Sequence, residues 1–351
     1  MRYCVSYVLP IRRNAVDESE IADLGGYFAE LPVAEVIVVD GSPSGVFKRH
    51  HDAWARFVRH VPVGPGIHVA NGKAAGVLTG MALVRNEVVI VADDDVRYDG
   101  ASVAGAIDAV SDADIVRPQN FFDPLPWHAR HDTARSLVNR ALDGDWPGTL
   151  VVRRSTFERA GGYDGDVLFE NLELVRTIRA ARGRERIARN LFVRRVPPST
   201  GRFFEQRVRQ AYNEFARPAR LISELAIAPA VIALALWRRY DALAVLCLAI
   251  IGLAEYGRRR DAGESHFAAT SALFAPGWAL ERGITSWLAV AVRVRLGGIR
   301  YGNTILRHAA TPRSILKVRF ERRTGPAAAR PELLQRSEMT PLAETRAPVL
   351  S

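Results

Sequence analysis

The stretch that most constrains how this chain folds is VVIVADDDV, residues 88–96. Five apolar or small residues run directly into Asp93, Asp94 and Asp95. A short β-branched run without period-2 alternation is typical of a strand buried on both faces, as in a parallel α/β sheet. Ligands of such sheets bind just outside the carboxyl ends of the strands. We therefore expect a functional site at this strand end.

Three adjacent carboxylates repel one another, and the sequence shows no obvious internal cation that would offset them. A hard divalent metal with oxygen ligands would relieve the repulsion, and a metal-bound diphosphate would follow naturally. The alternative is a solvated acidic turn that caps a helix starting near Tyr98. The rest of the chain favours the metal.

Length and charge limit the class of protein. With 351 residues, the chain can bury an α/β domain of about 200 to 250 residues and have material left over. The net charge of +10 is almost entirely due to arginine, and it suits nucleic acid, anionic lipid headgroups or phosphorylated substrates. Because no zinc-finger spacing, RNA-binding signature or basic-zipper heptad accompanies this charge, we expect no nucleic-acid partner.

The cysteines and the N-terminus bear on the compartment. Cys4 and Cys247 lie far apart in apolar contexts, which fits a reducing compartment and indicates neither a disulfide framework nor a metal cluster. The apolar stretch in MRYCVSYVLPIRR is too short for a signal peptide and predicts a first strand. We expect the N-terminal domain to lie in the cytoplasm.

Apolar runs and helical patterns alternate over residues 1–216. Strands are expected at 3–9, 34–39, 88–92, 113–117, 149–152 and 191–196, and helices at 18–31, 47–60, 74–84, 101–110 and 202–215. This alternation predicts an α/β fold with a mostly parallel sheet flanked by helices.

Four polar residues stand at the ends of these elements. Asp40 follows a predicted strand, where it can bind a ribose or base edge, although capping the next helix is favoured. Lys73 opens a helix whose N-terminus already carries partial positive charge, a conflict that a bound phosphate would resolve. Glu170 and Glu173 lie one turn apart at another helix start, where they are either catalytic or simply stabilised by the helix dipole.

Residues 121–145 are rich in aromatic and charged side chains. His128 and His131 are three residues apart and could form a metal pair on one helix face, but a surface pair is favoured. Trp127, together with Trp146 just beyond this stretch, is either a stacking platform for a sugar or part of the core.

The composition changes after residue 216. Residues 221–237 and 242–256 are nearly uncharged, and a tight basic turn joins them. Each has about 16 residues, which is short for a bilayer core of about 30 Å, but the pair still predicts a membrane hairpin rather than a buried helical pair. Arginines flank its outer ends and favour both ends inside. Residues 267–292 predict an interfacial or re-entrant segment. The expected organisation is a catalytic domain at 1–216, membrane-associated helices at 217–324 and a disordered tail at 325–351.

Taken together, these stretches resemble a family 2 glycosyltransferase of the GT-A fold. The matching pieces occur in the order of that family: VIVVDGS, NGK, VADDDV at the DxD position, AGGYDGDVLFENLEL and EQRVRQAY. The last piece resembles the QxxRW element of the membrane-bound branch. The resemblance covers about residues 3–215 and implies a GT-A type sheet, a nucleotide-sugar donor and Mg²⁺ or Mn²⁺ as cofactor.

The resemblance also implies roles for single residues. Asp40 would hold the base or ribose, and Lys73 would lie near the diphosphate. Asp93 would contact the nucleotide and, with Asp95, hold the metal, while Asp94 belongs to the same nucleotide-binding group. A metal is needed because the leaving diphosphate gains negative charge as the anomeric carbon becomes cation-like.

The sequence departs from the family pattern at the base. The usual Glu-Asp pair is Glu170-Asn171, and an amide cannot accept the acceptor's proton at neutral pH. Glu170 is therefore the candidate base. Weaker substitutes are Glu173, Asp164 and Asp166.

A second departure lies in the QxxRW-like element. Gln206 and Arg209 match and would hold the leaving diphosphate, but Gln210 replaces the tryptophan, with Tyr212 nearby. We therefore do not expect long processive polymerisation.

These features predict an inverting, metal-dependent glycosyltransferase that acts at the cytoplasmic membrane face on a lipid, a lipid-linked acceptor or another glycan. The alternative is a catalytically degenerate membrane protein that still binds a nucleotide sugar. A phosphatase of the haloacid dehalogenase type is disfavoured, because Arg97 occupies the slot where that motif has Thr or Val.

Overall fold

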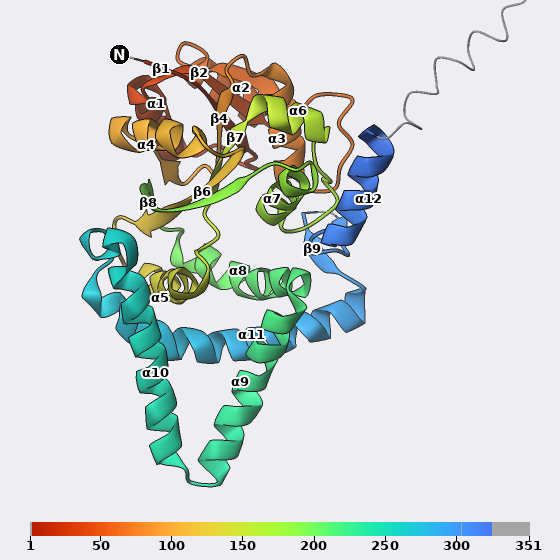
Figure 1. The fold of residues 1–351 in the computed structure, drawn as a ribbon. Helices are drawn as coiled ribbons and strands as arrows, with labels where there is room; N and C mark the ends of the chain where they lie inside the picture. Colours follow the sequence, from red (N-terminus) through yellow and green to blue (C-terminus); the bar gives the residue numbers. More distant parts are fainter. Residues whose placement is uncertain (1, 303, 325–351) are drawn as a thin grey trace, which may run out of the picture.

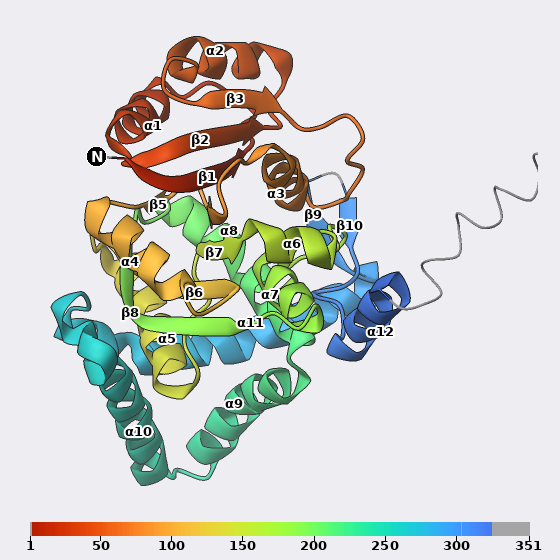
Figure 2. The same ribbon diagram turned by 45° about the horizontal axis from the view of Figure 1, so that its top comes forward.

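A single mixed sheet organises the N-terminal two thirds of the chain in the computed structural model, which describes residues 2–302 and 304–324. Its strand order is β3-β2-β1-β4-β7-β6-β8-β5, and helices cover both faces (Figures 1 and 2). The strands are β1 (Tyr3–Ile11), β2 (Val33–Asp40), β3 (Arg59–Pro62), β4 (Val88–Ala92), β5 (Val96–Arg97), β6 (Ile115–Phe122), β7 (Thr149–Arg153) and β8 (Glu185–Arg195). The α/β prediction is confirmed.

The sheet divides into a parallel half, β3-β2-β1-β4, and a mixed half, β7-β6-β8-β5. Neighbours among β3, β2, β1 and β4 all run parallel, as do β6 and β8. Strand β7 runs antiparallel to both β4 and β6, and β5 runs antiparallel to β8. The carboxyl ends of β1, β2 and β4 therefore meet at one edge, where ligands of parallel sheets bind.

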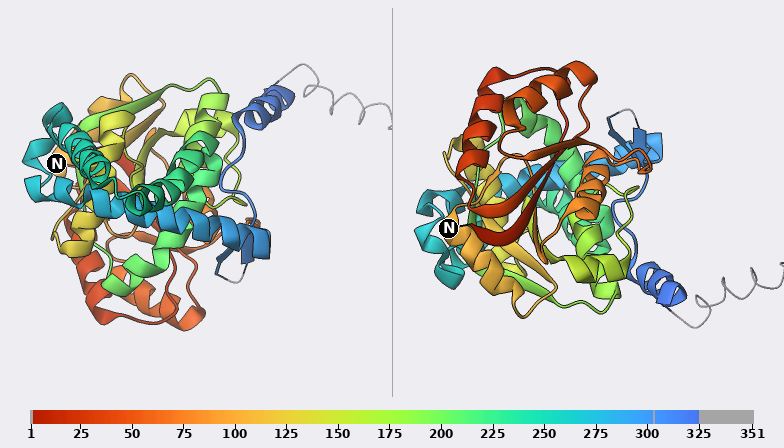
Figure 3. Two further views of the ribbon diagram at one scale, coloured as in Figure 1. Left: turned by 90° about the horizontal axis from the view of Figure 1, so that it is seen from below. Right: turned by 90° about the horizontal axis from the view of Figure 1, so that it is seen from above.

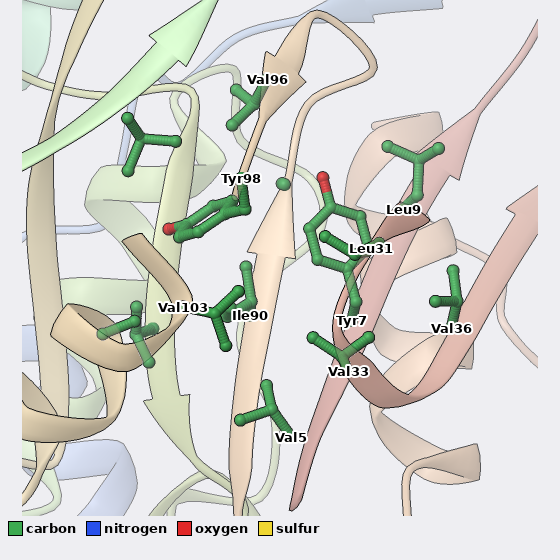
Figure 4. Close-up of a cluster of buried hydrophobic side chains, with 14 of the residues drawn as sticks. Val5, Tyr7, Leu9, Leu31, Val33, Val36, Ile90, Val96, Tyr98 and Val103 are labelled. Atoms are coloured by element: carbon green, nitrogen blue, oxygen red, sulfur yellow. The ribbon is translucent and has the colours of Figure 1, made fainter. Parts of the chain in front are cut away.

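Continuous apolar runs form the central strands because both faces are covered. In β1, Tyr7 and Leu9 pack toward α1 (Glu18–Glu30), whereas Val8 packs toward α3 (Gly72–Leu83) on the opposite face. Figure 4 shows the first of these clusters, in which Ile90 of β4 lies beside Tyr7 and Val103. The interpretation of residues 88–92 as a doubly buried strand is confirmed.

The remaining helices of this region are α2 (Ser44–Trp54), α4 (Gly100–Val110), α5 (Trp127–Leu142), α6 (Arg154–Ala160), α7 (Glu170–Ala180) and α8 (Thr200–Tyr212). The prediction of one helix over 47–60 is wrong in its second half. The helix ends at Trp54, and residues 59–62 form β3 on the edge of the sheet, since pairing with β2 satisfies their backbone groups.

Two long apolar helices follow the sheet region. They are α9 (Pro218–Leu236) and α10 (Tyr240–Arg259), with 19 and 20 residues, and both are long and apolar enough to cross a membrane. At 1.5 Å per residue each extends for about 28 to 30 Å, so they are longer than the sequence pattern predicts. They form a V that projects from the molecule and closes at its tip (Figure 1). Leu236 and Trp237 at the tip are more than 70% exposed.

A third helix crosses between the V and the sheet region. It is α11 (Ala275–Leu296), which is continuous because Pro276 lies in its first turn, where no backbone donor is lost. Seen from below, α11 runs across the base of the molecule (Figure 3, left). Glu224, the one acid inside the first apolar segment, is buried against α11 and accepts a 3.0 Å hydrogen bond from Ser286.

The last described elements are the short hairpin of β9 (Ile299–Tyr301) and β10 (Thr304–Leu306) and the helix α12 (Arg313–Thr324). The sequence analysis predicts none of the three, and the two strands, with three residues each, are too short to show a period. Left-handed Gly297, with φ +66°, ends α11 and directs the chain into β9. The expectation for 325–351 lies outside the described residues.

Candidate functional site

The three aspartates lie in a tight turn at the carboxyl end of β4. The backbone N–H of Asp93 donates to Gly148 O at 2.7 Å, and Val96 N–H donates to Asp93 O at 3.1 Å. The approach of Gly148 is so close that a Cβ there would lie 2.7 Å from Asp93 Oδ2. The turn is therefore held by the loop before β7, a segment more than 50 residues away in sequence.

Cations from distant segments pair with these acids, so the expectation that no internal cation offsets them is wrong. Lys73 Nζ lies 2.5 Å from Asp93 Oδ1. Arg195, at the end of β8, donates from Nε to Asp95 Oδ2 at 2.9 Å and lies 3.5 Å from Asp93 Oδ2. None of these partners is visible locally, because they come from the start of α3 and from a strand 100 residues later.

Asp94 pairs with a different cation, Arg13, which also pairs with Glu20 of α1. Burial acts against the charge of Asp94, but the Arg13 guanidinium outweighs it and lowers the pKa of that carboxyl. Asp94 is thus already neutralised within the protein, whereas Asp93 and Asp95 share Arg195, and Asp93 also pairs with Lys73.

Asp95 is the least compensated of the three. Burial raises its pKa to about 6; Arg195 opposes this shift, while Asp93 and Asp94 reinforce it. Its Oδ1 is buried and has no hydrogen-bond partner within the described part of the chain. A buried carboxylate oxygen without a donor is costly, and a bound cation would remove that cost.

Lys73 joins the aspartates to the candidate base. Its Nζ lies 2.5 Å from Glu170 Oε1 as well as from Asp93. Burial disfavours the ammonium, but Asp93 and Glu170 outweigh it and raise the pKa of Lys73 above its usual range. Two carboxylates therefore stabilise the lysine that begins α3. The side chains of all three are 15–21% exposed, so ligands can reach them.

The NGK motif positions this lysine. The side chain of Asn71 caps α3 by accepting from Lys73 N–H at 3.0 Å, and its amide donates to Val167 O at 2.9 Å. Further along α3, a Cβ at Gly76 would lie 2.6 Å from Pro10 Cβ, so the helix packs closely on β1. The start of α3 is thereby fixed beside the loop that leads into α7.

The other acids near Glu170 are engaged elsewhere. Glu173 is fully buried, accepts from Thr311 N–H at 2.7 Å, and has a pKa raised by burial. Asp164 pairs with Arg319 at 2.9 Å, and Asp166 accepts from Ala70 N–H at 2.8 Å. Among the four candidates for the base, Glu170 is the one that contacts Lys73.

A hydrogen bond accounts for Asn171, which stands where the resembled pattern has an acid. Its side-chain amide donates to Pro147 O at 3.0 Å, in the same loop as Gly148. A carboxylate at this position would place negative charge against a carbonyl oxygen, so the amide suits the site.

Gln206 and Arg209 line an open cavity of about 530 Å³ between α8 and the end of α11. Arg202 and Arg300 line it too, together with apolar residues that include Leu296 and Ile299. The charge of Arg202, on the rim of this cavity, contributes to lowering the pKa of Asp94. Within the described residues, Gln206 and Arg209 make no hydrogen bond or ion pair with the aspartates, so their role at the diphosphate stays a prediction.

Asp40 is enclosed by partners that the sequence analysis missed. It is 1% exposed; its Oδ2 lies 2.6 Å from His50 Nδ1 and 3.2 Å from His60 Nε2, and its Oδ1 accepts from Ser42 N–H. Burial acts against its charge, but hydrogen bonds from His60, Ser42 and His50 outweigh it and hold the pKa below its usual value.

This Asp-His-His group has ligand atoms within 4.8 Å of one another, the spacing of a metal centre. Hydrogen bonds already satisfy it, since His60 Nδ1 also lies 3.3 Å from His51 Nδ1. No sequence spacing could reveal it, because Asp40, His50 and His60 come from three different elements. The nucleoside role of Asp40 stays a prediction.

The aromatic candidates of residues 121–146 divide between core and surface. His128 is 6% exposed, and both it and His131 pack against Phe203, so the interpretation as a surface pair is wrong. Trp146 packs on Phe169 and lies 3.8 Å from the Arg117 guanidinium carbon, as a core residue does. Trp127 is half exposed beside Phe203.

Comparison with known proteins gives similarity to solved glycosyltransferases. One is a mannosyltransferase from Pyrobaculum calidifontis in complex with GDP-Man and Mn²⁺, with 17% identity, 85% of this chain and 77% of that chain covered, and a TM-score of 0.44. Another is glucosyl-3-phosphoglycerate synthase from Mycobacterium tuberculosis in complex with Mn²⁺, uridine diphosphate and phosphoglyceric acid, with 16% identity, coverage of 56% and 72%, and a TM-score of 0.36. TarS of S. aureus has 12% identity, coverage of 60% and 39%, and a TM-score of 0.40. No protein-family model and no curated protein matches the sequence.

Proposed function

We propose that this protein is an inverting, metal-dependent glycosyltransferase that moves a sugar from a nucleotide-sugar donor to a lipid, lipid-linked or other glycan acceptor. The observation that carries the proposal is the centre at the end of β4. There Asp93, Asp95, Lys73 and Glu170 meet in a partly open site, and one carboxylate oxygen of Asp95 lacks a partner within the described residues.

The donor set fits Mg²⁺ or Mn²⁺. Oxygen ligands suit both ions, and Asp95 Oδ1, which has no partner among the described residues, would hold the ion together with Asp93. Bound there, it would offset the negative charge that develops on the leaving diphosphate. Lys73 would add a second positive charge beside that diphosphate.

Donor binding would also prepare the base. In the free protein Lys73 holds the carboxylate of Glu170, which cannot then accept a proton freely. A diphosphate beside Lys73 would draw the ammonium away from Glu170. The released carboxylate would take the proton of the acceptor hydroxyl. The hydroxyl oxygen would form a bond to the anomeric carbon on the side opposite the diphosphate, and the bond from that carbon to the diphosphate oxygen would break.

The membrane assignment rests on the C-terminal helices. Large apolar side chains are exposed along α9, α10 and α11, including Leu236, Leu248 and Trp287, and exposure on this scale marks an interaction surface. Because α9 begins and α10 ends beside the sheet region, a spanning hairpin would keep that region on one side (Figure 1). The arginines at those ends favour the cytoplasmic side.

The decisive experiment is calorimetric titration of detergent-purified protein with a panel of nucleotide sugars, with and without Mn²⁺. Asp95→Asn is compared with wild type and with Asp108→Asn, which removes an exposed carboxylate of α4 away from the site. We expect wild type and Asp108→Asn to bind one nucleotide sugar in the presence of Mn²⁺, and Asp95→Asn to lose that binding. Equal metal-dependent binding by Asp95→Asn would refute the assigned metal site, and no binding by wild type would refute the donor site.

The alternative is a protein that binds a nucleotide sugar without transferring it. The amide of Asn171, which occupies the usual base position and is fixed on Pro147, favours this alternative. Sugar transfer to membrane lipids that Glu170→Gln abolishes would exclude it. Donor binding without turnover on any lipid or glycan would establish it.

A further inference from the structure

The cavity between α8 and the end of α11 combines two kinds of surface. Arg202 and Arg209 of α8 and Arg300 of β9 contribute three guanidinium groups, against one acid, Glu205. Val292, Leu296 and Ile299 form an apolar wall. With a volume of about 530 Å³, the cavity is large enough for a headgroup and the start of a chain.

The three arginines are free to bind an anion. Within the described part of the chain none of them makes an ion pair, although most arginines near the acidic turn do. Three guanidinium groups around one space repel one another unless a negative group lies between them, and the planar guanidinium matches phosphate oxygens with paired donors.

The apolar wall leads toward the proposed membrane surface. Leu296 ends α11, and Val294 in the same turn is 80% exposed. Further back along α11, Trp287 and Leu288 are about half exposed. An aliphatic chain that leaves the cavity over this wall would reach the face of α11 on which we place the bilayer.

The arginine side of the cavity lies toward the proposed catalytic residues. The Arg209 guanidinium carbon lies 5.9 Å from the ring centroid of Tyr301, and the charges of Glu170 and Lys73 act on the Tyr301 phenol. A group held by Arg209 would therefore lie near Tyr301, within the range over which the charge of the proposed base acts.

We infer that this cavity binds the phosphate of the acceptor, and that the acceptor is a phosphate-bearing lipid with an aliphatic or isoprenoid chain. The inference rests on the proposed function and narrows its acceptor class. A soluble phosphorylated acceptor would satisfy the arginines but would leave the apolar wall without a partner, so the structure favours the lipid.

The test uses the full-length protein and neutral phosphatidylcholine vesicles, with or without an isoprenyl phosphate, and with the matching isoprenol as the uncharged control. Arg202→Gln and Arg300→Gln are compared with Arg295→Gln, an exposed arginine of α11 that does not line the cavity. Because all three side chains are exposed, the variants are expected to fold, and their melting temperatures check this. Metal-dependent binding of the donor is measured in parallel.

We expect the isoprenyl phosphate, but not the isoprenol, to increase vesicle binding of wild type and Arg295→Gln. Arg202→Gln and Arg300→Gln should each bind the isoprenyl phosphate about tenfold more weakly. Their donor affinity should not change. Equal binding by all variants would overturn the inference, and full competition by inorganic phosphate would assign the cavity to a soluble phosphate instead. If wild type shows no metal-dependent binding of the donor, that result would refute the proposed function rather than the cavity assignment.

Discussion

Two strand ends of the same sheet carry an acid after an apolar run, and their environments are opposite. At the end of β2, Asp40 is enclosed by His50, His60 and a backbone N–H, and its pKa is held below the usual value. At the end of β4, Asp95 keeps one oxygen without a partner among the described residues, and burial raises its pKa to about 6. The carboxylate of Asp40 is held by its hydrogen bonds as part of the structure, whereas the unpaired oxygen of Asp95, at the carboxyl end of a buried strand, suits a bound cation.

The largest effect is expected from a change in the site at the end of β4. Glu170→Gln removes the candidate base while keeping its size, so kcat should fall roughly a hundred- to a thousandfold. Donor affinity should change little, because Lys73 keeps Asp93 as a partner. Steady-state transfer assays together with donor titration separate the effect on kcat from the effect on donor affinity. A kcat within about twofold of wild type would remove Glu170 from the mechanism.

A change at the end of β2, where Asp40 is enclosed, should instead lower the stability of the protein. Asp40→Asn leaves two histidines without their carboxylate, and loss of one partner of a buried pair costs about 3 kcal/mol. Asp95→Asn removes an ionised form that burial already disfavours, so it should cost much less. Urea unfolding of both variants measures the difference. Similar losses of unfolding free energy would break the distinction between the two ends.

Gly148→Ala tests how tightly the turn after β4 is packed. The added Cβ would lie 2.7 Å from Asp93 Oδ2 and 3.2 Å from Arg195 Cζ, so both side chains must move. We expect transfer to fall about tenfold and stability by about 1 kcal/mol. Gly100→Ala, at a glycine with open space around it, is the control. Unchanged donor binding and transfer in Gly148→Ala would show that the turn tolerates displacement.

The smallest effect is a pH dependence that follows from Asp40. Its pKa is lower in the folded than in the unfolded state, so its stabilising contribution is present above the unfolded pKa of about 3.9 and is lost as the pH falls through the folded value. The stability gap between wild type and Asp40→Asn should therefore narrow below about pH 4. Thermal unfolding of both proteins between neutral and acidic pH measures it. A gap that widens on acidification would contradict the direction of this shift.

Local pattern predicted much of the sheet region. Buried strands such as residues 88–92 show themselves as continuous β-branched runs, and Asn71-Gly72-Lys73 marks a helix start through its cap. The edge strand β3 was missed because its pairing with β2 decides its conformation, and the β9–β10 hairpin because its strands are too short to show a period.

The sequence by itself determined which residues carry charge at the strand ends and which runs are apolar enough to be buried or to meet a membrane. Only the tertiary structure decided which acids find hydrogen-bond and ion-pair partners. Arg195 reaches Asp95 across 100 residues, Lys73 reaches Glu170 across 97, and two histidines from separate elements enclose Asp40. Ion pairs and hydrogen bonds act over a few ångströms, so the fold sets which carboxylate remains open for a ligand.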